Sequence, residues 1–338
     1  TGWFGVKKFL AVFLSILLSF SLLLPAAAAT DTDPCPLVVV RGMQFTGLYT
    51  DLGTENEHMY LERVNAGNIA LSIVKALAMG LLNLSKDAFA DSLIDSLLWM
   101  FEELACDGNG DSVFPVSALT CPGNFSQYEA TADLGDGGED ALIKAACERY
   151  GAENVYYFVY DWRLDPYDIA EDIHETVELA KAEHHTDQVN LIACSMGGIM
   201  TNAYFYRYGA DSVNSCLYLS STFQGTYCTT DLLQGKAEVN QPALSYLISS
   251  RADGAMSLLA SVFTNSGLLS LVCALGDRFI DTFQEDIYER FMRPTFATLP
   301  SLWAVTLPEE LESCLSFVYP TEELQQQYAG VIARARRM

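Results

Sequence analysis

A short apolar segment that runs into a turn of small residues constrains this chain more than any other feature. Val189 to Cys194 have the composition of a buried strand, and Ser195 follows directly before a helical segment. A serine on so sharp a strand-to-helix corner needs small residues two positions before and after it, and Ala193 and Gly197 meet this need. The pattern predicts a nucleophile elbow, with the Ser195 hydroxyl at the carboxyl edge of a sheet.

Strands and helices alternate on both sides of this corner. Apolar runs are separated by longer helical segments, which implies right-handed crossovers and a mostly parallel sheet with helices on both faces. The predicted strands are Pro36–Val40, Val155–Tyr160, Gln188–Ala193 and Ser215–Leu219. Half of the 338 residues are apolar, so the chain can bury a large core, and the predicted class is α/β.

The chain divides into three predicted parts. Residues 1–29 resemble a secretory signal, residues 30–227 form the α/β core, and residues 228–338 form a helical cap over the serine. The core carries an insertion at about residues 50–138, in which two helical segments between Leu61 and Leu104 are expected to cover the sheet. The alternative for the C-terminal region is helical packing at the face of the sheet.

The first residues predict export. Lys7 and Lys8 precede an apolar run from Phe9 to Leu24, and four alanines follow at Ala26–Ala29, which is the pattern that a signal peptidase accepts. We expect a cleaved signal and a secreted protein; an uncleaved membrane anchor is the alternative, disfavoured because the run falls short of the ~20 residues of a spanning helix.

Charge and cysteine content limit the partners. The net charge of −24 disfavours nucleic acid and anionic lipid, so contact with a lipid surface would be apolar and made through the cap. Nine cysteines in an exported chain suggest disulfides, with Cys106–Cys121 and Cys273–Cys314 as possible pairs. Cys194, in the buried end of its strand, is the candidate for a free thiol.

A serine nucleophile also needs oxyanion donors. The amide of Met196, directly after the serine, and the amide of Met43, where the strand ending at Arg41-Gly42 opens into a loop, are the candidates. The alternative interpretation of Arg41-Gly42-Met43 is an ordinary turn at the end of a strand.

The base is harder to assign. In α/β folds with a nucleophile elbow, an acid and then a histidine follow the serine along the chain, whereas all four histidines of this chain precede Ser195. His184 and His185 should lie roughly 20 Å away, at the opposite edge of the sheet. His174 is interpreted as a surface residue, and His58 lies in the loop region after the first strand. Either the last strands, with their acid and histidine, lie beyond this C-terminally truncated chain, which we favour, or the protein is a non-catalytic relative.

Several motifs together resemble the lecithin:cholesterol acyltransferase-like branch of the α/β-hydrolases. They are Tyr157 to Leu164 with its Asp-Trp-Arg triplet, Val189 to Ile192, Ser195-Met196-Gly197-Gly198, Thr222 to Gly225 and Leu299 to Trp303. Cys194 departs from the histidine that is usual in that family. The resemblance implies attack of Ser195 on a lipid ester to give an acyl-enzyme, which is resolved by water or by an acceptor hydroxyl, without a cofactor.

The triplet Asp161, Trp162 and Arg163 ends the strand beside the elbow strand, so we expect it at the rim of the site. Asp161 and Arg163 are candidates for an ion pair, and a packed structural corner is the alternative. The segment Asp107 to Asp111 resembles a calcium loop, but Ser112 stands where a glycine is required, so we interpret it as a solvated turn and predict no metal.

Two hypotheses of other classes stay open beside the secreted serine esterase. One is a lipid-binding or surface-binding protein that keeps the fold without a catalytic base. The other is a membrane-anchored envelope protein whose cap helices make contacts with partners.

Overall fold

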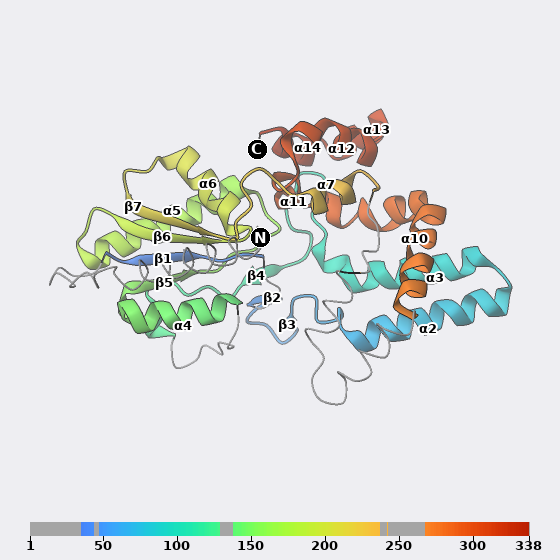
Figure 1. Ribbon diagram of the computed structural model, residues 1–338, viewed down its shortest axis with the longest axis horizontal. Helices are drawn as coiled ribbons and strands as arrows, with labels where there is room; N and C mark the ends of the chain where they lie inside the picture. Colours follow the sequence, from blue (N-terminus) through green and yellow to red (C-terminus); the bar gives the residue numbers. More distant parts are fainter. Residues whose placement is uncertain (1–34, 44–46, 129–137, 237–241, 243–267, 338) are drawn as a thin grey trace, which may run out of the picture. The chain divides into compact units, whose positions relative to one another are not determined.

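The computed structural model describes residues 35–43, 47–128, 138–236, 242 and 268–337 (Figure 1). All of them belong to the unit Cys35–Met338. The predicted signal at residues 1–29 and part of the predicted cap lie outside the described residues.

The central feature is a four-stranded parallel sheet with the strand order β5-β1-β6-β7. Val38 pairs with Tyr156 on one side and with Leu191 on the other, and each neighbouring pair of strands is parallel. The prediction of an α/β protein with a parallel sheet is therefore confirmed. The strands are β1 (Leu37–Val40), β5 (Val155–Phe158), β6 (Val189–Cys194) and β7 (Val213–Leu219).

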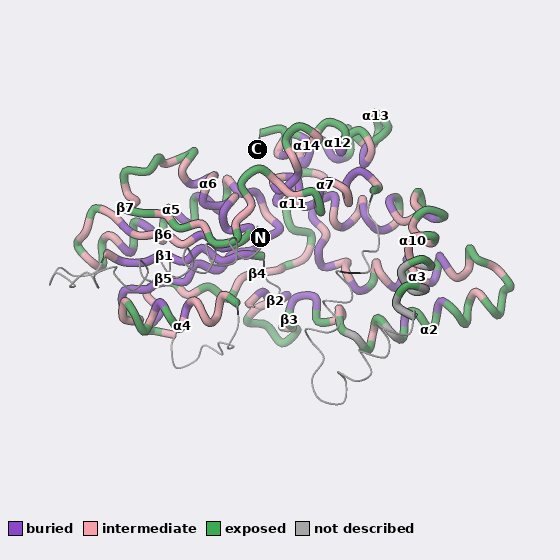
Figure 2. The backbone as a smooth tube through the Cα atoms, viewed as in Figure 1, coloured by how far each residue is buried: buried purple, intermediate pink, exposed green. Residues whose placement is uncertain are grey.

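Helices cover both faces of this sheet. Figure 1 shows α5 (Pro166–His184) and α6 (Gly197–Tyr208) on one face and α4 (Gly138–Tyr150) on the other. Alternate residues of β1 divide between the two layers: Val38 packs with the α5 and α6 side, and Val39 with the α4 side. All four residues of β1 are buried, which is why this strand is apolar throughout (Figure 2).

The strand β7 lies at the edge of the described sheet. Its side chains are buried less than those of β1, and Leu217 and Leu219 are exposed. A smaller antiparallel sheet has the strand order β3-β2-β4. Along the chain, β2 and β3 come before the helices of the insertion, and β4 comes after them. Its strands are β2 (Leu48–Thr50), β3 (His58–Met59) and β4 (Val116–Ala118).

The insertion contains a helical hairpin of α2 (Ala66–Asn83) and α3 (Lys86–Phe101). Both helices begin at a residue whose side chain accepts a backbone N–H of the first turn, Asn65 for α2 and Ser85 for α3. The helices are present where the sequence predicts them. Three short 3₁₀ segments complete this half of the chain: η1 (Glu102–Leu104), η2 (Phe125–Gln127) and η3 (Ala152–Asn154).

The expectation that α2 covers the sheet with its large apolar residues is wrong. Among the side chains of this helix whose burial is described, Ser72 and Ala76 are the buried ones, and one turn later a Cβ on Gly80 would lie 2.9 Å from Phe89 Cβ of α3. Small residues spaced by four therefore form the contact with α3, and the large ones face solvent. We call the following residues, each between 50% and 92% exposed, the α2 apolar surface: Leu71, Val74, Leu77, Leu81, Leu82 and Leu84.

The C-terminal region is helical, with no strand among its described residues. Trp303 and Tyr319 share a hydrophobic core with Ile94 of α3, so the insertion and the C-terminal helices pack together. The elements are α7 (Tyr227–Leu233), α10 (Leu268–Ile287), η4 (Tyr288–Met292), η5 (Phe296–Thr298), α11 (Pro300–Ala304), η6 (Pro308–Glu310), α12 (Leu311–Val318), α13 (Glu322–Gln327) and α14 (Ala329–Arg337).

The cysteines do not pair as the sequence suggests. Cys106, Cys121 and Cys314 are free thiols, so neither the Cys106–Cys121 nor the Cys273–Cys314 bridge is present. Cys194 is free and buried, as predicted. Among the described helices, none combines the length and the hydropathy that a bilayer crossing requires.

Candidate active site

The Ser195 corner is a sharp connection between a strand and a helix. The strand β6 ends at Cys194 and α6 begins at Gly197. Ser195 has a φ of 48°, in the left-handed region that a residue with a side chain adopts at a cost of about 1–3 kcal/mol. Its amide donates to Leu219 O at 3.0 Å and its carbonyl accepts from Thr222 N at 3.3 Å, so the end of β7 holds the strained turn in place. Ser195 itself is exposed.

The small residues on either side of Ser195 lie where space is restricted. Ala193 is completely buried. A Cβ on Gly197 would lie 2.5 Å from the carbonyl oxygen of Arg41 and 2.7 Å from that of Val40. Because both obstacles are backbone atoms of the neighbouring strand, only glycine fits at this position without moving β1.

The two predicted oxyanion donors flank the corner. Met43 is exposed just beyond β1, and Met196 is buried at the start of α6. Within the described residues, neither amide donates a hydrogen bond. The first N–H groups of a helix lack acceptors inside the helix, which suits Met196 to this role.

An acidic side chain that sequence reasoning did not select also reaches the corner. Glu139, in the first turn of α4, accepts the amide hydrogen of Gly42 at 2.9 Å through Oε1. The position that a Cβ on Gly42 would occupy lies 2.6 Å from this oxygen and 2.9 Å from Ser195 Cβ. No local pattern marks Glu139, because α4 packs on the sheet far from Ser195 along the chain.

The Asp-Trp-Arg triplet forms a buried corner with the expected ion pair. Asp161, Trp162 and Arg163 are all buried, Arg163 completely. The guanidinium uses all five of its donors inside the protein. Its partners are Asp161 Oδ1 at 3.0 Å, Asp161 Oδ2 at 2.7 Å, Glu103 O at 2.8 Å, Leu104 O at 3.2 Å and Ser112 Oγ at 2.7 Å. The triplet therefore ties the loop after β5 to the insertion, and the guanidinium has no donor left for a substrate.

The four histidines lie elsewhere in the fold, and none forms a hydrogen bond with Ser195 in the described part of the chain. His174 stacks on Tyr208 with ring centres 4.0 Å apart, and His184 and His185 lie at the end of α5. His58 Nε2 lies 2.7 Å from Oε1 of the buried Glu103. The hydrogen bond to the Asn56 carbonyl, and then the one to Glu103, raise the pKa of His58. The sequence did not reveal Glu103 as the partner of this histidine.

The calcium-like segment is a turn held by its own side chain. Asp107 Oδ1 accepts from the amides of Asn109 at 2.8 Å and Asp111 at 3.1 Å, while Asp111 pairs with Arg334. No cluster of His, Cys, Asp or Glu in the described residues has the arrangement of a metal site.

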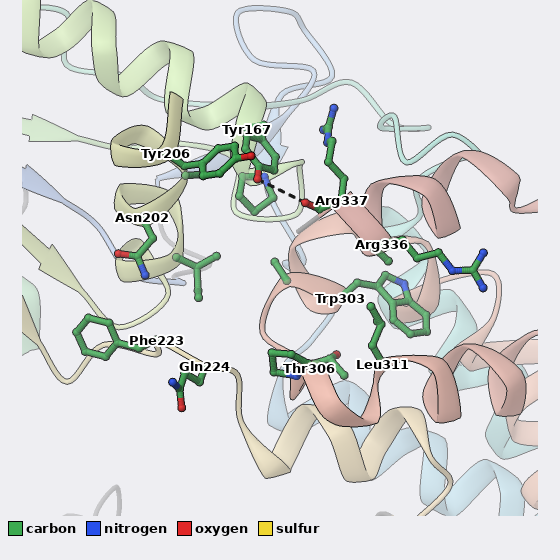
Figure 3. Close-up of a pocket in the computed structure, with 16 residues that line it drawn as sticks. Tyr167, Asn202, Tyr206, Phe223, Gln224, Trp303, Thr306, Leu311, Arg336 and Arg337 are labelled. Atoms are coloured by element: carbon green, nitrogen blue, oxygen red, sulfur yellow. Dashed lines mark hydrogen bonds between the residues drawn. The ribbon is translucent and has the colours of Figure 1, made fainter. Parts of the chain in front are cut away.

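Two cavities of about 510 Å³ each lie near the site, and neither includes Ser195. The first lies between α6, the loop after β7 and the C-terminal helices (Figure 3). Figure 3 labels the residues Tyr167, Asn202, Tyr206, Phe223, Gln224, Trp303, Thr306, Leu311, Arg336 and Arg337 on its walls. Arg336 pairs with Glu312 and Arg337 with Asp165. The second cavity borders Tyr157 to Asp161.

The C-terminal helices approach the carboxyl edge of the sheet at two loops. The amide of Ser301 donates to the Arg163 carbonyl at 3.3 Å, and the amide of Thr226 donates to the Val305 carbonyl at 2.7 Å. These bonds place α11 beside the loops that follow β5 and β7, which are the two strands on either side of β1 and β6.

Comparison of the chain with protein-family models, with curated proteins and with solved structures finds no match.

Proposed function

We propose that this protein is a serine hydrolase of the α/β-hydrolase type that acts on carboxylic esters, lipid esters above all, through an acyl-enzyme. The proposal depends on one observation: Ser195 is exposed and has a φ of 48° at a sharp strand-to-helix corner. At this corner, the absence of a side chain on Gly197 allows the backbone at the end of β1 to pass closely. The motifs that resemble the lecithin:cholesterol acyltransferase-like family support the same activity.

In the proposed reaction, Ser195 Oγ attacks the ester carbonyl carbon and forms a tetrahedral intermediate. The amides of Met43 and Met196 donate hydrogen bonds to the negative oxygen. The alcohol leaves, and water or an acceptor hydroxyl then releases the acyl group from Ser195. No cofactor or metal is needed for these steps.

A lipid substrate is supported by the α2 apolar surface. Five large apolar residues of this surface are exposed on a helix that carries Lys75 as its one charged residue and no acid, and the sixth, Leu84, is the C-cap of that helix. The chain as a whole has a net charge of −24. Apolar surfaces of this kind mark sites of interaction with proteins or lipid. The sequence predicts lipid contact through the cap at residues 228–338, whereas this surface lies in the insertion.

The alternative function is a lipid-binding protein that keeps the elbow without catalysis. It is favoured by one observation, that none of the histidines contacts Ser195 in the described residues. In both cases, secretion is proposed from residues 1–29 alone.

The decisive test is labelling with a fluorophosphonate probe, which reacts with activated serines, followed by mass spectrometry of the labelled peptide. We expect the label on Ser195 and its loss in Ser195→Ala. Ser117→Ala, which removes another exposed serine, on β4, is the matched control and should label fully. An unlabelled protein, or a label that survives Ser195→Ala, contradicts the hydrolase and favours the lipid-binding protein.

A further inference from the structure

The Glu139 carboxylate lies directly against the Ser195 corner. Its Oε1 and the Cβ of Ser195 lie 2.6 Å and 2.9 Å from the same point, the position of a Cβ on Gly42. The absence of a side chain on Gly42 is therefore what lets the carboxylate and the serine approach each other. The Gly42 amide, at 2.9 Å, holds Oε1 at this place.

The electrostatics of the surrounding residues agree with this placement of the negative charge. Burial, and then the charge of Glu139, raise the pKa of the Cys194 thiol to about 12, and Cys194 directly precedes Ser195. Burial and the same carboxylate also raise the pKa of the Tyr160 hydroxyl, which donates to the Arg41 carbonyl at 2.8 Å. The carboxylate therefore lies close to Cys194, at the end of β6, and to Tyr160, just after β5.

A serine hydroxyl reacts only when a neighbouring group takes its proton. None of the four histidines forms a hydrogen bond with Ser195 in the described residues. A carboxylate is a chemically competent general base, and hydrogen bonds at catalytic sites often tighten only when the substrate binds. Glu139 supplies such a carboxylate beside Ser195.

We infer that Glu139 is the general base that activates Ser195, an inference that rests on the proposed hydrolase function. As Oγ bonds to the ester carbonyl carbon, its proton passes to the Glu139 carboxylate, and the carbonyl π electrons move to the oxygen. When the tetrahedral intermediate collapses, the carbon–oxygen bond to the leaving alcohol breaks. Glu139 returns the proton to that alcohol oxygen and is again a carboxylate. Water then repeats the cycle on the acyl-enzyme.

The test compares the rate of fluorophosphonate labelling at Ser195, and the hydrolysis of a p-nitrophenyl ester, in Glu139 variants. Glu139→Gln keeps an acceptor for the Gly42 amide but removes the basicity, so both rates should fall by about 100-fold or more. Glu139→Asp keeps a carboxylate and should retain part of the activity. Glu148→Gln, an exposed acid on the same helix, should react as the wild type does. Thermal unfolding of each variant excludes loss of the fold as the cause.

A pH profile separates a base from a structural side chain. A carboxylate base is active when deprotonated, so the wild-type rate should rise with pH through the pKa of the base and then level off. Glu139→Gln should lose this rise. The wild type and Glu139→Gln share the other titratable or charged groups near this site, so these groups do not account for a difference between the two pH profiles. Within the described residues, these groups are Arg41, Asp140, Tyr157, Tyr160 and Cys194.

Two results overturn the inference while leaving the hydrolase intact. If Glu139→Gln labels at Ser195 at the wild-type rate with the same pH profile, Glu139 is not the base. If Glu139→Gln labels faster than the wild type, the Glu139 carboxylate instead hinders binding of a negative oxygen at the amides of Met43 and Met196. A wild-type protein that does not label at Ser195 overturns both the hydrolase and its base.

Discussion

Arg163 binds both carboxylate oxygens of Asp161, two residues before it, with Nε 3.0 Å from Oδ1 and Nη2 2.7 Å from Oδ2. The same guanidinium lies over the ring of Tyr60, with Cζ 5.3 Å from the ring centre. The pair is buried, and it holds the loop after β5 against the insertion.

The Asp161–Arg163 pair should be needed for stability. Arg163→Ala leaves a buried carboxylate without its counter-charge and should lower the free energy of unfolding by about 3–5 kcal/mol, measured by urea denaturation. The control is Glu178→Gln, which breaks a partly exposed pair with Lys181 on one helix and should cost less than about 1 kcal/mol. Equal losses for the two variants would contradict a structural role for the triplet.

Gly197 should not tolerate even a methyl group. Gly197→Ala would place its Cβ 2.5 Å from the Arg41 carbonyl, so β1 must move, and we expect a loss of about 1–3 kcal/mol in the free energy of unfolding. Labelling of Ser195 should fall with it. Gly67→Ala, in the first turn of α2, would place its Cβ 3.3 Å from the Asn65 side chain and meets no other described atom closely, so labelling should be unchanged. Wild-type labelling in Gly197→Ala would show that the close approach is not required.

The α2 apolar surface should bind lipid. The double substitution of Leu81→Ser and Leu82→Ser removes two residues that are 73% and 81% exposed, so stability should change little. Binding to phosphatidylcholine vesicles, measured by flotation, should weaken by more than about tenfold, because each buried leucine contributes about 1.5–3 kcal/mol. Val113→Ser, at an exposed valine outside this surface, is the control. Equal flotation of the double variant and the wild type would exclude α2 as the contact.

The His58–Glu103 pair should stabilise the protein only while His58 is charged. The pKa of His58 is raised in the folded state, first by the Asn56 carbonyl and then by Glu103, so the stabilisation is fully present below about pH 6.5, the ordinary value. It should be lost as the pH rises through the raised pKa. The measurement is the difference in the free energy of unfolding between wild type and His58→Asn from pH 5.5 to 9. His185→Gln provides the comparison, and a difference that grows with pH would contradict the pairing.

Much of the fold could be predicted from the residues in order. The strand from Val189 to Cys194 is visible because a parallel strand buried on both faces must be apolar throughout. The position of Ser195 follows from the small residues Ala193 and Gly197, since only such residues allow the sharp turn. These are local properties, and they need no knowledge of which segments meet.

Other features depend on contacts between distant segments and could not be predicted. Ile69 and Leu77 have the spacing of a buried helical stripe, yet α2 packs on α3 through Ser72, Ala76 and Gly80, because backbone proximity favours small residues over large ones. Nothing in the sequence near Glu103 indicates that it binds His58.

The amino-acid sequence by itself determined the parallel sheet, the helices and the corner at Ser195, because periodicity and residue size act over a few neighbouring positions. Only the tertiary structure decided which side chains surround that corner. Glu139 reaches Gly42 across the layer between α4 and β1, and the long-range packing that brings them together leaves no pattern in either segment.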